Sequence, residues 1–127
     1  MDWDNLVKPA WQARESAYAP YFKFPVGAAL LALDGRILSG CNVENISYGL
    51  AERVAIGAAV AAGVRKFLAV AVVADTVVPT SPCRGCRQVL TEFGVPLVIL
   101  ANRNERVEFL LKELLLRASA GIPDRQE

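Results

Sequence analysis

The sequence contains no histidine among its 127 residues. This absence excludes catalytic triads built on histidine, and it removes imidazole from the possible ligands of a metal. Cysteine and carboxylate side chains must therefore carry any metal or acid–base chemistry. The three cysteines are an odd number without a paired disulfide framework, so we expect the reducing environment of the cytoplasm rather than secretion.

The chain also lacks a strong net charge and a long apolar run. Its 14 basic and 13 acidic residues leave a net charge of +1, which gives no electrostatic footprint for nucleic acid or an anionic membrane. The longest strongly apolar run, residues 67–74, is far too short to cross a bilayer. The N-terminus shows no signal-peptide pattern. We therefore expect a cytoplasmic protein without nucleic-acid or membrane partners.

No low-complexity linker or internal repeat interrupts the chain, and its length suits a single domain over residues 1–127. Apolar spacing and turn residues predict helices that alternate with buried strands, which indicates a layered α/β sandwich. The predicted helices are a first segment capped by Asp2 or Asp4 and ended by Pro20, residues 51–62, a segment from the cysteines to about Phe93, and residues 112–120. The predicted strands are 26–33, 36–43, 67–74 and 95–101, with Asp34-Gly35 as a hairpin turn, while 107–110 fits a last strand or the start of a helix.

The segment 81–90 (SPCRGCRQVL) places two cysteines three residues apart at the start of a predicted helix. Pro82 suits the first turn, and Ser81 can cap it. The spacing puts both sulfurs on one side of the helix, and the helix dipole stabilises thiolates at this end. Such a pair suits a soft divalent ion, zinc first. A redox pair and a purely structural zinc site are alternative interpretations of Cys83 and Cys86.

Three further polar residues lie near the ends of predicted elements. On an extended chain Asn42 and Glu44 face the same side, whereas Cys41 faces the other. Glu52 lies at the start of the alanine-rich helix. This helix and the cysteine helix both begin after a strand and a loop. Their N-termini can therefore meet at one end of the sheet, where α/β proteins usually bind ligands.

Three segments together carry a resemblance to a known family. Residues 40–50 (GCNVENISYGL), Ala51-Glu52-Arg53 and the segment 81–90 resemble the small homotetrameric zinc-dependent cytidine deaminases. The resemblance covers nearly the whole chain. It implies a three-layer α-β-α sandwich with a central mixed sheet of about five strands. It also implies hydrolytic deamination of cytidine and 2′-deoxycytidine to uridine and 2′-deoxyuridine, with release of ammonia, in pyrimidine salvage.

The resemblance further implies Zn²⁺ as the cofactor, a nucleoside as the small-molecule substrate, and a homotetramer. Zinc would be held by Cys83, Cys86 and a third cysteine, and it would activate the water that attacks C4 of cytosine. The remaining implied roles are Glu52 as the proton shuttle, Asn42 and Glu44 as ligands of the ribose 3′-hydroxyl, Phe24 as a neighbour of the pyrimidine, and Arg53 as compensation for the thiolate charge.

The third cysteine of the family pattern is missing from this sequence. It normally stands two residues before the glutamate, where this chain has Leu50, and the family usually carries three more residues at this point. A water, Glu52 itself or, less favourably, Cys41 would then complete the metal site. The alternative function is therefore a catalytically impaired protein of the same fold that binds nucleosides or assembles with an active relative.

The candidates also have purely structural interpretations. Glu52 has the position of an ordinary glutamate in the first turn of a helix, where the dipole favours it. Asn42 and Glu44 are compatible with solvated residues at a strand end, and Phe24 with a core residue. Arg53, Arg84 and Arg87 fit either surface charges or partners of the two thiolates. Ser119 replaces an aromatic residue that in relatives reaches a neighbouring subunit's site.

Overall fold

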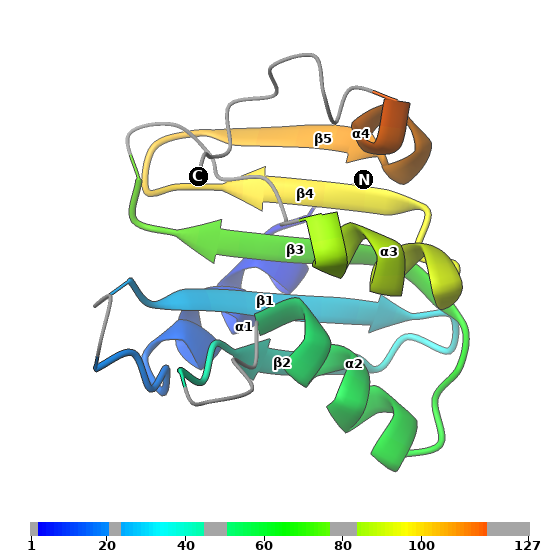
Figure 1. Ribbon diagram of the computed structural model, residues 1–127, viewed down its shortest axis with the longest axis horizontal. Helices are drawn as coiled ribbons and strands as arrows, with labels where there is room; N and C mark the ends of the chain where they lie inside the picture. Colours follow the sequence, from blue (N-terminus) through cyan, green and yellow to red (C-terminus); the bar gives the residue numbers. More distant parts are fainter. Residues whose placement is uncertain (1–2, 21–23, 45–50, 77–83, 117–127) are drawn as a thin grey trace.

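The computed structural model describes residues 3–20, 24–44, 51–76 and 84–116, with the backbone alone for 84–86 and 114–116. Within these residues a five-stranded sheet lies between helix α1 on one face and helices α2 and α3 on the other (Figure 1). The predicted three-layer α-β-α sandwich is confirmed. The elements in chain order are α1 (Asp4–Arg14), β1 (Val26–Ala32), β2 (Ile37–Cys41), α2 (Ala51–Ala61), β3 (Phe67–Ala74), α3 (Arg84–Glu92), β4 (Leu97–Ala101), β5 (Arg106–Leu110) and α4 (Leu111–Leu116).

The strands lie in the order β2-β1-β3-β4-β5. β1 pairs antiparallel with both β2 and β3, β3 pairs parallel with β4, and β4 pairs antiparallel with β5. This pairing confirms the predicted mixed sheet, and it settles the ambiguous segment near residue 107 as a strand. β1 and β2 form the predicted hairpin, in which Gly35 has the positive φ of 96° that favours glycine in such turns.

Alternation along the strands distributes the apolar side chains between two core layers. In β1, Leu30 belongs to the layer that includes residues of α2 and α3, whereas its neighbour Ala29 belongs to the layer that includes residues of α1. In β3, Val72 and Val73 divide in the same way. β3 is buried on both faces, as predicted from its continuous apolar run, with Leu68 as its one exposed residue.

Helix α1 ends earlier than the sequence predicts. Its last residue is Arg14, well before Pro20, because the following segment pairs with the chain beyond β2. The Tyr18 N–H donates to the Asn42 carbonyl at 3.0 Å, and the Tyr18 carbonyl accepts from the Glu44 N–H at 2.7 Å. This long-range pairing overrides the apolar periodicity that favoured a longer helix.

Two smaller expectations are also corrected. Asp4 does not cap α1, because it lies inside the first turn and the N-cap residue is Trp3, which makes no side-chain capping bond. Asp2 lies outside the described residues. β4 starts at Leu97 rather than at Val95, since the Val95 N–H donates to the Leu90 carbonyl at 3.0 Å and thereby closes the end of α3.

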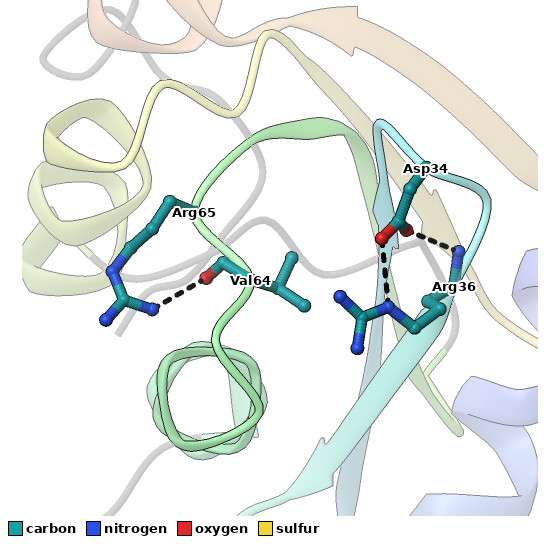
Figure 2. A network of polar contacts seen from close by, with 4 residues as sticks. All are labelled: Asp34, Arg36, Val64 and Arg65. Atoms are coloured by element: carbon teal, nitrogen blue, oxygen red, sulfur yellow. Dashed lines mark hydrogen bonds and ion pairs between the residues drawn. The ribbon is translucent and has the colours of Figure 1, made fainter.

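The turn after β1 and the loop after α2 lie together at one end of the sheet (Figure 2). The Leu33 N–H donates to the Lys66 carbonyl at 2.9 Å and joins the two segments. Within the turn, the Asp34 carboxylate accepts from the Arg36 N–H and from Arg36 Nε, both at 3.0 Å. The backbone bond is the main reason that the pKa of Asp34 lies below its ordinary value.

The C-terminal end of α2 is closed by its own loop. The Arg65 guanidinium donates to the carbonyl of Val60, in the last turn of α2, at 3.1 Å. It also donates to the carbonyl of Val64 at 3.2 Å (Figure 2). Gly63 follows with a φ of 83°, as predicted for a helix ended by glycine. In the described part of the chain, no helix is long and apolar enough to cross a membrane.

Candidate active site

Glu52 lies in the first turn of α2, and the position of this turn is set by Gly40 of β2. A Cβ on Gly40 would lie 2.5 Å from the Ala55 nitrogen and 2.8 Å from the Ala51 carbonyl oxygen. A residue without a side chain is therefore required for the helix backbone to approach the strand this closely. In this position Glu52 is buried, with 5% of its surface exposed.

The start of α3 lies on the same side of the molecule as the start of α2. The two helices contact one another on one face of the sheet, and both begin toward the end at which β3 and β4 terminate (Figure 1). α3 carries Cys86 in its first turn, and Cys83 lies just before it, outside the described residues. The structure thus confirms that the two helices begin at a common end of the sheet.

Asn42 and Glu44 follow β2 and are both buried, each with 2% of its surface exposed. Their interpretation as solvated residues at a strand end is therefore wrong. The Asn42 side chain accepts from the Val26 N–H and donates to the Phe24 carbonyl, both at 2.9 Å. These two bonds fix the orientation of the amide. They leave one N–H and one acceptor lone pair of the amide for a further partner.

Phe24 is not a core residue, because 40% of its surface is exposed. Its carbonyl is held by Asn42, so a predicted base contact and a predicted ribose contact are joined through one hydrogen bond.

Arg53 is exposed on α2. Its proximity to the thiolates stays a prediction, because Cys83 lies outside the described residues. Arg87, by contrast, is buried at 3% exposure, so its interpretation as a surface charge is wrong.

The face of the sheet on which Cys41 lies argues against Cys41 as the third metal ligand. It is directly paired with Gly27 of β1, and residues opposite one another across two strands share a face. A Cβ on Gly27 would lie 1.9 Å from the Ala10 carbonyl oxygen of α1. Cys41 therefore faces α1, on the side of the sheet opposite to Glu52. Burial raises the pKa of its thiol, which is a free cysteine.

The donor set fits a zinc ion in part. Two cysteines at i, i+3 are suitable soft ligands, whereas a catalytic zinc site normally has three protein ligands and one open position. Among the residues that the structure describes, no group of three or more cysteine, histidine or acidic side chains is arranged to hold a metal. Leu50, at the position of the missing cysteine, lies outside these residues and has no donor atom.

Sequence reasoning missed two side chains that organise the surroundings of the site. Arg14 Nε donates to the Pro25 carbonyl at 3.2 Å, next to Phe24. Asn102, buried after β4, donates to the Thr76 carbonyl at 2.9 Å and so holds the chain that leaves β3. Asn102 carries a local turn signal, because its Oδ1 also accepts from the N–H groups of Asn104 and Glu105. The contacts to Pro25 and Thr76 have no such signal, because each joins segments far apart in the chain.

An α/β sandwich with a buried glutamate at the start of one helix, and a Pro-Cys-x-x-Cys segment leading into its neighbour, defines the class of zinc-dependent deaminases. A family model described as the cytidine and deoxycytidylate deaminase zinc-binding region matches residues 1–102. The chain belongs to this family.

Individual relatives agree with this assignment. The chain is 54% identical over 113 residues to a cytidine deaminase of Sporosarcina psychrophila, which covers 85% of this chain and 83% of the relative. The crystal structure of cytidine deaminase from Burkholderia pseudomallei is similar with a TM-score of 0.84 and 47% identity, covering 90% of this chain and 96% of the other. The cytidine deaminase structure from Mycobacterium tuberculosis gives a TM-score of 0.76 and 41% identity, covering 91% and 94%.

Proposed function

We propose that the protein is a zinc-dependent cytidine deaminase, which hydrolyses cytidine and 2′-deoxycytidine to uridine and 2′-deoxyuridine and releases ammonia. The observation that carries the proposal is the buried Glu52 at the start of α2, beside the helix that carries Cys86. Relatives named cytidine deaminases match most of the chain at high identity. The family description names zinc as the metal of this region.

Glu52 is the residue to which we assign proton transfer. The chain has no histidine, and a carboxylate at the start of a helix, next to the cysteine helix, is suitably placed for acid–base work. Glu52 would accept a proton from the attacking water and pass it to N3 of the pyrimidine. It would then take the remaining proton of the new C4 hydroxyl and give it to the C4 amino group, which leaves as ammonia. Zinc, held by Cys83 and Cys86, would lower the pKa of water to about 7, so that hydroxide is available as the nucleophile at neutral pH.

The nucleoside would be held by residues at the end of the β1–β2 hairpin that lies away from Arg36 and the turn. Asn42 retains a free donor and a free acceptor position, and it is buried together with Glu44, so the two suit a ribose hydroxyl. A buried polar site of this kind rejects analogues that lack the hydroxyl. The exposed ring of Phe24 is available to the pyrimidine. Arg53 would offset the negative charge of the thiolates.

We also propose the cellular setting that the family resemblance implies. The chain would form one domain over residues 1–127, act in the cytoplasm in pyrimidine salvage, and assemble as a homotetramer. Its near-neutral charge agrees with a small nucleoside as partner rather than nucleic acid. Sedimentation of the purified chain at micromolar concentration tests the assembly, and a monodisperse monomer would contradict it.

The first experiment is to measure conversion of cytidine to uridine by the purified chain, with added zinc and with a zinc chelator. We expect turnover that the chelator removes. A folded chain without turnover at saturating zinc would contradict the proposal. It would instead support the alternative, a catalytically impaired member of the family that binds nucleosides or joins an active relative. The specific observation behind that alternative is Leu50 in place of the third cysteine.

A further inference from the structure

Three consecutive backbone groups around Phe24 are each held by a side chain from another element. Asn42 holds the Phe24 carbonyl and the Val26 N–H. The carbonyl between them, that of Pro25, accepts from Arg14 Nε at 3.2 Å. We propose that Arg14 is a positioning residue for nucleoside binding, which acts by fixing Phe24 against the base. This inference rests on the proposed function, in which Phe24 contacts the pyrimidine.

Arg14 reaches this segment from a fixed platform. It is the last residue of α1, and the end of this helix lies against β1, where a Cβ on Gly27 would come within 2.9 Å of the Arg14 Cβ. Its guanidinium also lies 5.6 Å from the centre of the Trp11 ring, a distance at which a cation and an aromatic ring attract one another. The donor at Nε is therefore presented by a packed helix end.

The bond matters because the Phe24 ring is anchored in neither core layer of the described residues, so the backbone that carries it contributes to its orientation. Its side chain is 40% exposed and is not part of either core layer. Pro25 has no N–H, so its carbonyl is the one backbone group of that residue that can accept or donate a hydrogen bond. When the bond to Arg14 is lost, the side-chain bonds left on the backbone of residues 24–26 are the two from Asn42, at the Phe24 carbonyl and the Val26 N–H. The ring would then sample orientations that do not suit the base.

A matched pair of substitutions separates the hydrogen bond from the charge. In Arg14→Gln the amide Nε2 occupies the place of Arg14 Nε along the side chain, so the donor is kept and the charge is lost. Arg14→Met has similar length and no donor. The control is Arg103→Met: Arg103 lies 4.0 Å from the Trp11 ring and pairs with Asp75 at 3.7 Å, and none of these contacts involves residues 24–26.

The readout is binding of uridine, the expected product, by titration calorimetry, which does not require turnover, together with KM and kcat for cytidine. We expect Arg14→Met to weaken uridine binding and raise KM by about five-fold, the size of one lost hydrogen bond, with kcat nearly unchanged. Arg14→Gln and Arg103→Met should leave binding within about two-fold of the parent protein. Should Arg14→Met not fold, Arg14→Glu, which has the size of glutamine without a donor, replaces it.

A double-mutant cycle with Phe24→Ala decides whether Arg14 acts through Phe24. We expect Arg14→Met to have no further effect on uridine binding in that background. An equal loss in both backgrounds, or no loss in either, would overturn the inference. If Phe24→Ala weakens binding and Arg14→Met does not, the inference alone fails. If Phe24→Ala leaves binding unchanged, the proposed base contact is wrong, and the inference fails with it.

Discussion

Gly40 of β2 and Ala51 of α2 are so close that a Cβ on Gly40 would lie 2.8 Å from the Ala51 carbonyl oxygen. The next residue of the helix is Glu52, to which we assign the proton transfers. The depth of this carboxylate in the molecule therefore depends on a glycine in a neighbouring strand, twelve positions earlier in the chain than the glutamate.

Gly40→Ala should displace the first turn of α2. Because the added carbon meets backbone atoms, which cannot rotate away, we expect a loss of about 2 kcal/mol or more in the free energy of unfolding. Turnover should fall along with stability, since Glu52 moves with the helix. The matched control is Gly57→Ala in the same helix, where a Cβ meets nothing within 4 Å. It should raise stability by about 0.5–1 kcal/mol. Equal thermal midpoints for the two variants would contradict this account.

Glu52→Gln should abolish turnover while the fold persists. Glutamine is nearly isosteric with glutamate, but it cannot accept the proton of the attacking water, and general acid–base catalysis typically contributes about 10²–10⁴-fold. The measurement is uridine formation, with circular dichroism as the check on folding. Retained turnover in a folded Glu52→Gln protein would remove this residue as the proton shuttle.

Cys41 should behave as a shielded thiol that zinc does not protect. Burial raises its pKa above the ordinary value of 9.0, so the fraction of reactive thiolate at pH 8 is lower than in the unfolded chain. Because the folded state favours the neutral thiol, its contribution to the free energy of unfolding is fully present below the pKa of the unfolded thiol. This contribution is lost as the pH rises through the higher pKa that the thiol has in the folded protein. Alkylation by iodoacetamide, followed by mass spectrometry, should be slower at Cys41 in the folded than in the unfolded protein. Added zinc should slow modification of Cys83 and Cys86 alone, and zinc-dependent protection of Cys41 would contradict its placement on the α1 face.

Leu50→Cys should strengthen zinc binding, because it restores a cysteine two residues before the glutamate. A third thiolate completes the usual set of three protein ligands, and we expect the zinc affinity to rise about ten-fold or more. Competition with a chromophoric chelator measures this affinity independently of activity. Leu50→Ser, which adds a hydroxyl of similar size to the thiol, is the control and should change the affinity little. Equal affinities for the two variants would show that a cysteine at this position does not reach the metal.

Much of this protein was determined by local sequence alone. The span of β3 is the span of its continuous apolar run, 67–74, and α2 begins and ends close to its predicted limits, near Glu52 and Gly63. The Asp34-Gly35 pair forms the predicted turn. These features follow from side-chain periodicity and from turn residues, which act over a few positions of the chain. The family likewise followed from short motifs, since their chemistry needs particular residues at fixed spacings.

The tertiary structure alone decided which of these residues meet. Pairing of Tyr18 with the chain beyond β2 ended α1 early, and the second use of Asn42, as a clamp on Phe24, required the folded arrangement of β1 and β2. The proposed role of Arg14 likewise depends on a long-range contact, its bond to the Pro25 carbonyl. Each of these contacts joins residues that are many positions apart, so its geometry depends on how the layers pack. Local propensity describes single elements, whereas the distances that position a site are set by the contacts between them.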